Sequence, residues 1–201
     1  MTLSMPTTPA FTVVRFGLIT NTQTFTSPLT KSTQRAVLAG AIWSAAYSLP
    51  KMPRAQAQPW KAFFLSLEGM GNTFYGYDPD CKQPLAGIQG APLVNGANQT
   101  GTSLITDGWL NSKTVLKMGD YFTTGGELKM VTLNDVVSDG SGNATINFEP
   151  AIRTSPGDNT ALTIQQASCT MMLQDDNQAL WTCDEFGVYA PFTFAAMETF
   201  S

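Results

Sequence analysis

The sequence predicts a mainly β protein in which a β-rich domain with one α-helix is interrupted by a small β-barrel. Apolar and polar residues alternate near both ends of the chain, as in half-buried strands. One stretch has the spacing of an amphipathic helix. Between residues 81 and 167 the chain is rich in Gly, Pro and Asn, with short strand-like runs between turn signals, which is typical of a barrel.

The first strands are expected near the N-terminus. Strand-like runs cover Phe11–Leu18 and Gln34–Leu38, and every second residue from Trp43 to Leu49 is apolar. Because alternate residues of a strand point to the same face, the third run presents one apolar face. We expect antiparallel strands with that face on a core.

The predicted helix carries an apolar stripe at positions i, i+3, i+4 and i+7: Trp60, Phe63, Phe64 and Leu67. Pro53 suits the start of this helix, and Gly69 suits a left-handed stop. Pro59 inside it would cost about 3 kcal/mol, because proline removes a hydrogen bond and clashes with the preceding turn. We therefore expect either a kink or a start near Gln58.

A strand at Thr73–Tyr77 follows and ends in a turn at Asp78–Asp80. Packing of the helix against the strands predicts a core that contains Trp43, Tyr47, Trp60, Phe63, Phe64, Leu67 and Phe74.

The middle region is expected to hold five short strands: Thr114–Leu116, Tyr121–Thr123, Glu127–Val137, Ala144–Phe148 and Ala161–Gln166. Longer apolar runs return at Cys169–Leu173 and Phe186–Phe194, similar in character to the first eighty residues. The pattern indicates an outer domain, residues 1–80 plus 168–201, with a barrel inserted at 81–167.

Gly125 and Gly126 could form a phosphate-binding loop or a hairpin turn. A Walker loop needs GxxxxGK followed by Ser or Thr at the start of a helix, whereas the run Glu127–Leu133 is strand-like. Two glycines between strands accept positive φ at little cost. The pattern favours a hairpin turn.

The polar segment that starts at Asp139 begins like a calcium loop. Its sixth position is Ala144 instead of glycine, and its twelfth is Pro150 instead of glutamate. It has turn-forming residues at Asp139, Gly140 and Gly142. We expect a second hairpin turn, and no metal or cofactor.

The composition argues against several classes of partner. Charged residues make up 13% of the chain, against about 25% in an average protein, and the formal net charge is -4. The 11 Lys and Arg residues are scattered, which disfavours nucleic acid. We expect no signal peptide and no membrane insertion, because no apolar run reaches about 20 residues. Such a weakly charged surface suits contact with other subunits.

Catalytic and metal-binding patterns are weak. The chain has no histidine, and its three cysteines are expected as buried or half-buried free thiols: Cys81, Cys169 and Cys183. Paired carboxylates, which can hydrolyse glycosides, occur at Asp78/Asp80, Asp175/Asp176 and Asp184/Glu185. Since all three pairs lie in polar or turn-like segments, we expect solvated loop charges and no enzyme.

Two stretches resemble distal tail proteins of long-tailed bacteriophages. The first, from Arg15 to Asp80, has a W...Y.LP strand, an RAQA..W..F helix and an FY..DPD strand in that order. The second, from Leu93 to Pro156, is similar to the barrel segment of short members of the family. Pro59 departs from the family pattern, in which Ala or Gln is more usual.

The resemblance implies a homo-hexameric ring that joins the tail-tube protein to the baseplate hub around the tape-measure protein. Short members insert an oligonucleotide/oligosaccharide-binding (OB) type barrel into a β-sandwich-like, ring-forming domain. The expected location is the tail tip of the virion, after assembly in the host cytoplasm. The runs Phe11–Leu18 and Val37–Leu49 are expected at the subunit interface.

The alternative function is a carbohydrate-binding tail adhesin that contacts a host glycan. Its binding residues would lie on the barrel, at positions such as Trp109 or Tyr121. A third possibility, a hydrolase, would use Asp78/Asp80 or Asp175/Asp176.

Overall fold

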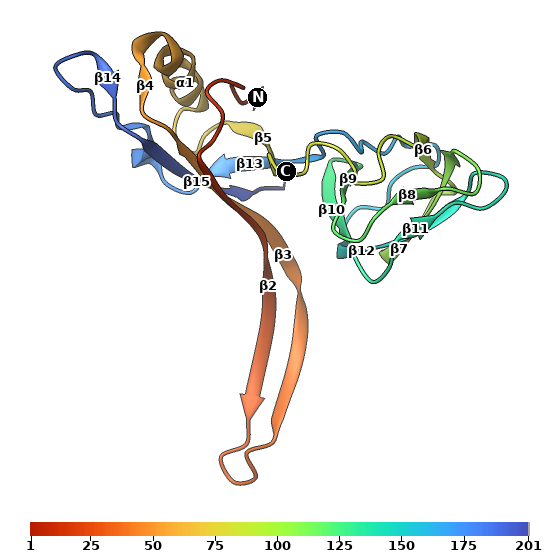
Figure 1. The fold of residues 1–201 in the computed structure, drawn as a ribbon. Coiled ribbons are helices and arrows are strands. Elements are labelled where there is room, and N and C mark those ends of the chain that lie inside the picture. The colour runs from red at the N-terminus through yellow and green to blue at the C-terminus, as the bar shows by residue number, and fades with distance from the viewer. Residues whose placement is uncertain (201) are drawn as a thin grey trace.

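The computed structural model describes residues 1–200 and confirms the predicted mainly β class with a single α-helix. Figure 1 shows a sheet covered by the helix, a long two-stranded arm and a small barrel beside the sheet. The helical elements are α1 (Arg54–Leu67) and the 3-10 turn η1 (Asp176–Ala179). Within residues 1–200, no helix has the length and apolarity that a bilayer span requires.

The strands are β1 (Thr2–Ser4), β2 (Val13–Thr26), β3 (Thr33–Leu49), β4 (Met52–Pro53), β5 (Thr73–Tyr77), β6 (Gly90–Val94), β7 (Gly101–Trp109), β8 (Thr114–Leu116), β9 (Tyr121–Thr124), β10 (Glu127–Val131), β11 (Val136–Val137), β12 (Ala144–Ile152), β13 (Ser168–Leu173), β14 (Val188–Tyr189) and β15 (Phe192–Glu198).

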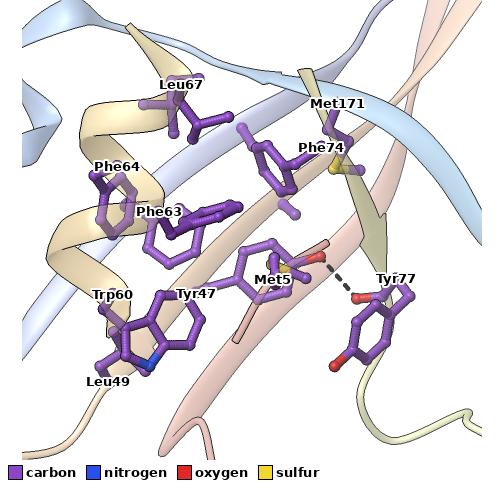
Figure 2. Packing of buried hydrophobic residues seen from close by; sticks show 14 of the residues in the cluster. Met5, Tyr47, Leu49, Trp60, Phe63, Phe64, Leu67, Phe74, Tyr77 and Met171 are labelled. Carbon is purple, nitrogen blue, oxygen red and sulfur yellow. Dashed lines mark hydrogen bonds between the residues drawn. The ribbon is translucent and has the colours of Figure 1, made fainter. Parts of the chain in front are cut away.

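A six-stranded sheet packs one face against α1. Its order is β1-β5-β13-β15-β3-β2, and every neighbouring pair is antiparallel except β1 with β5. All the predicted core residues are buried here: Trp43, Tyr47, Trp60, Phe63, Phe64, Leu67 and Phe74. Figure 2 shows the side chains of α1 facing those of β3 and β5. Each large side chain buried in this way contributes about 1.5 to 3 kcal/mol, so this core holds the outer domain together.

The buried aromatic side chains also satisfy their polar atoms. The Tyr47 hydroxyl donates to the carbonyl of Tyr77 at 2.7 Å, the dashed line in Figure 2. Trp60 Nε1 donates to the carbonyl of Thr8 at 2.9 Å. A buried polar atom without a partner would cost about 1 to 3 kcal/mol. These bonds therefore tie the N-terminal segment and β5 to the core.

The helix begins at Arg54, so the predicted start near Gln58 is wrong. Pro59 lies inside the helix, where Ala57 and Trp60 on either side of it are fully buried. Their burial offsets the hydrogen bond that proline removes. The left-handed stop begins one residue before the predicted Gly69: the C-cap Glu68 has a φ of 50°, and Gly69 follows with a φ of 66°.

The barrel region contains a five-stranded sheet, β6-β7-β12-β10-β9, and a two-stranded ribbon, β11-β8. Its separate core consists of aliphatic and aromatic residues: Val94, Leu104, Trp109, Val115, Leu116, Phe122, Val131, Val136, Ala144, Ile146, Phe148, Leu162 and Ile164. The bounds predicted for the insertion, 81 and 167, fall between β5 and β6 and immediately before β13.

Two predicted barrel strands are wrong. The run Glu127–Val137 is divided into β10 and β11, because a turn occurs at Leu133, whose φ is 69°. The run Ala161–Gln166 is not a strand, although Ala161 and Thr163 form isolated bridges. The structure adds strands β6 and β7, which lie in the Gly-, Pro- and Asn-rich stretch where no strand is predicted.

Candidate assembly arm

The most exposed part of the fold is the hairpin of residues 19–40, which we call the arm. In Figure 1, β2 and β3 leave the sheet together and project away from both cores. Every arm residue is exposed except Ser27, which is half-buried. The predicted strands Phe11–Leu18 and Gln34–Leu38 are thus parts of a longer hairpin, because β2 continues to Thr26 and β3 is unbroken from Thr33 to Leu49.

The arm starts at an irregularity in the β2–β3 ladder. The register shifts between Ile19, which pairs with Ile42, and Asn21, which pairs with Leu38. Gly40 lies in the additional segment with a φ of 108°, where a side chain would be strained. The Asn21 side chain donates to the carbonyl of Ala39 at 3.2 Å. A bulge of this kind bends and twists a ladder, and here it occurs where the arm leaves the sheet.

The tip of the arm is a hydrogen-bonded turn. The Ser27 and Lys31 amides donate to the carbonyls of Ser32 and Ser27, both at 2.9 Å. Lys31 has a φ of 58°. The hydroxyls of Thr26 and Thr33 form a hydrogen bond at 3.1 Å. The turn therefore presents its side chains in a defined arrangement.

The two faces of the arm differ in chemistry. Residues that pair directly across an antiparallel ladder share a face, and alternate residues along a strand do so too. One face carries Asn21 with Leu38 and Phe25 with Gln34. It continues the face of the sheet that α1 leaves open, since Ile19 precedes Asn21 by two positions.

The other face of the arm is rich in threonine, with Val37 and Arg35 on β3. The exposed fractions are 82% for Val37, 66% for Phe25 and 92% for Leu29 at the tip. A two-stranded hairpin with no third layer is marginally stable in water by itself, and a partner that covers it would bury these side chains. The arm is therefore suited to lie against another chain.

The base of the arm is attached to the barrel by hydrogen bonds. Trp43 Nε1 donates to the carbonyl of Leu128 at 2.9 Å, and the Trp43 amide donates to Glu198 Oε2 at 3.0 Å. Arg153 donates to the carbonyl of Ala41 and lies 3.5 Å from Glu198 Oε2. These contacts hold the barrel against the strand that carries the arm.

A second ion pair lies inside the barrel, where Glu127 also accepts the amide of Arg153. Lys129 Nζ, which is fully buried, donates to Glu127 Oε2 at 2.7 Å. Burial opposes ionisation of Glu127, but hydrogen bonds from Lys129 and the amides of Thr154 and Arg153 outweigh it and hold the pKa of that carboxyl below its ordinary value. Burial raises the pKa of Glu198, and this effect exceeds the opposing one of the hydrogen bond from the Trp43 amide.

The predicted hairpin turns are located as follows. Gly125 and Gly126 connect β9 to β10, with φ of 56° and 82°. Asp139 Oδ1 accepts the amides of Ser141 at 2.8 Å and Asn143 at 2.9 Å, in the turn before β12. Gly140 and Gly142 lie in that turn, and a Cβ at Gly142 would collide with the carbonyl of Trp109.

The carboxylate pairs lie in three separate loops, where they organise backbone turns. Asp78 Oδ1 accepts the amide of Asp80, and Asp175 Oδ1 accepts that of Asn177. Asp184 Oδ1 accepts the amides of Phe186 and Val188. Among residues 1–200, no group of three or more His, Cys, Asp or Glu residues is placed to hold a metal ion.

The barrel residues named for glycan binding do not form an exposed platform. Trp109 is buried, and its Nε1 donates to the hydroxyl of Thr106 at 2.8 Å. Tyr121 packs edge-on against Trp43 and Phe16. Both residues take part in packing, with Trp109 buried and Tyr121 half-buried, and glycan binding at the barrel stays a prediction.

The three cysteines are free thiols. Cys169 is buried and Cys81 is half-buried, whereas Cys183 is exposed. The expectation of a buried or half-buried thiol is therefore wrong for Cys183.

No protein-family model matches the chain, and a search of curated proteins found no match.

Proposed function

We propose that this chain is a structural virion protein, a distal tail protein that forms a ring between the tail tube and the baseplate hub of a long-tailed bacteriophage. The observation that carries the proposal is the arm. It places Phe25, Leu29 and Val37 in solvent, where they gain nothing from the chain's own core. A partner that covers them recovers about 25 cal/mol for each Å² of apolar surface buried.

A ring requires two different contact surfaces on each subunit, because only a head-to-tail contact can repeat around an axis and close. The arm supplies one surface, at one side of the sheet. Beside the arm, the sheet face that α1 leaves open carries small side chains such as Ser44, Ala46 and Ala195, over which a neighbouring subunit can pack closely. The arm is therefore one of the two surfaces that a closing ring needs, and its counterpart must lie elsewhere on the protomer.

The remaining surface suits an adaptor. Charged residues are only 13% of the chain, so large contacts can form with little desolvation of charge. The partners proposed are five further copies, the tail-tube protein, the hub and the tape-measure protein, in the virion tail tip. The protein acts through its geometry, without turnover.

Light scattering on a size-exclusion column tests the proposal. The full chain at high concentration, alone and with tail-tube subunits, is expected as a ring with a mass that is a multiple of 21.6 kDa. Negative-stain images of the peak should show closed rings. A strictly monomeric protein under all these conditions would overturn the proposal.

A further inference from the structure

A groove of about 590 Å³ lies beside the start of β2. Its apolar floor includes Phe11, Val14 and Phe16, and its far wall is the loop after β5 with Asp78 and Asp80. The near wall is formed by residues 6–10 of the N-terminal segment, which include Pro6 and Pro9. The exposed surface of the groove is more polar than apolar, so it suits a segment that carries both polar and apolar side chains.

Both walls are held in place by hydrogen bonds. On the near side, the carbonyl of Thr8 accepts from Trp60 Nε1, and the Thr12 amide donates to the carbonyl of Ser48 at 2.8 Å. On the far side, Asp78 accepts the amide of Asp80 at its side chain and that of Cys81 at its carbonyl, both at 3.1 Å. The groove is therefore formed before any partner binds.

The charge of the groove and that of the arm are opposite. Asp80 is exposed, and within residues 1–200 its carboxylate takes part in no hydrogen bond or ion pair. Lys82 is the one basic residue among those that line the groove. The arm has two charged residues, Lys31 and Arg35, and both are basic.

We propose that this groove receives the arm tip of a second copy of the chain, with Leu29 on the apolar floor and Lys31 beside Asp80. The inference rests on the proposed ring, and it names the contact that repeats around it. Leu29 is 92% exposed in the single chain, and burial on Phe11 and Phe16 would remove its apolar surface from water. The carboxylates orient the tip through Lys31.

The occupant is a second copy, because the chain's own tip cannot reach the groove. Strand β2 begins at the groove with Val13 and runs without interruption to Thr26 at the tip. Fourteen extended residues cover about 45 Å, so the two ends of β2 are far apart. A contact between tip and groove is therefore intermolecular and head-to-tail, which is the type that closes a ring.

A charge-exchange series tests the contact. Lys31→Glu and Asp80→Lys are each expected to raise the concentration needed for half-assembly by roughly fivefold to tenfold, since like charges would then face each other. The double variant restores opposite charges, so its concentration for half-assembly should be close to that of the unmodified protein. Lys113→Glu, an exposed lysine on the barrel, is the matched control and should change little.

A cross-linking experiment on the unmodified chain needs no variant. A carbodiimide that joins amines to carboxylates is applied to an equal mixture of isotope-labelled and unlabelled protein. Mass spectrometry should find Lys31 joined to Asp80 or Asp78 between labelled and unlabelled copies. Circular dichroism of each charge variant checks that its monomer is folded.

The outcomes separate the two proposals. Assembled rings without the Lys31 cross-link, and without recovery in the double variant, would overturn the groove contact and leave the ring in place. A protein that never assembles would overturn both. Recovery in the double variant together with the intermolecular cross-link supports the contact.

Discussion

The two halves of strand β3 have the same partner strand and opposite surroundings. In the inner half, Trp43, Ala45, Tyr47 and Leu49 are buried at every second position. In the outer half, from Thr33 to Gly40, every residue is exposed. Pairing with β2 is thus enough to form the strand, whereas burial of one face decides where the chain is stable by itself. The outer half is therefore available to another chain.

Removal of a large side chain from the inner half should have the largest effect. Trp43→Ala deletes a fully buried indole and its hydrogen bond to Leu128. The free energy of unfolding should fall by about 3 to 5 kcal/mol, as measured by urea denaturation. Val37→Ala in the outer half is the control, with a change below about 0.5 kcal/mol. A loss below about 1 kcal/mol for Trp43→Ala would show that the buried inner half of β3 does not stabilise the single chain more than the outer half does.

The same contrast applies to charged residues. Lys129→Met leaves Glu127 buried without its partner and should destabilise the protein by about 3 kcal/mol. The double change Lys129→Met with Glu127→Gln should recover much of that loss. Arg35→Met on the arm should be close to neutral for the free chain, because Arg35 is exposed. Equal losses at Lys129 and Arg35 would show that the arm is not independent of the cores.

The bulge at Gly40 separates the two halves, so a change there should act locally. Gly40→Val introduces a β-branched side chain at a φ of 108°, at a cost of about 1 to 3 kcal/mol. Hydrogen exchange should accelerate at arm amides while those of β13 and β15 keep their protection. Unchanged exchange in the arm would exclude Gly40 as the origin of its bend.

The smallest expected effect concerns the pH dependence of stability, which should differ between the turn at Asp139 and the turn at the arm tip. Hydrogen bonds from the side chain and amide of Asn143, and from the amide of Ser141, hold the pKa of Asp139 below its ordinary value of 3.8. The stabilisation is therefore present above about pH 4 and is lost as the pH falls through the lower, folded-state pKa. Asp139→Ala should flatten the pH dependence of unfolding in that acidic range. The arm tip has no carboxylate, so Lys31→Ala should leave the dependence intact.

Local periodicity explains which elements the sequence predicts. The stripe from Trp60 to Leu67 arises because one helical face is buried, and the strand at Thr73–Tyr77 is found with the predicted bounds. Residues 19–33 lack alternation of apolar with polar residues, since both faces of the arm are exposed. For that reason the sequence does not predict that the hairpin continues past the bulge at Gly40.

Other features depend on contacts that no local pattern contains. The turn at Leu133 has neither glycine nor proline to mark it, so Glu127–Val137 has the pattern of one strand. The junction between the sheet and the barrel joins Trp43 to Leu128, which are 85 positions apart. The burial of Trp109 likewise depends on strands that meet only in the folded barrel. Tertiary contacts, and not local sequence patterns, determine the turn, the junction and the burial of Trp109.

The central claim is that the arm serves assembly and not the stability of the single chain. The most direct measurement compares the unmodified protein with a Phe25→Ser, Leu29→Ser double variant by light scattering and urea denaturation. Unfolding of the dissociated chain should change by less than about 0.5 kcal/mol at each position, while the ring should be replaced by the 21.6 kDa monomer. A variant that assembles as well as the unmodified protein would contradict the claim.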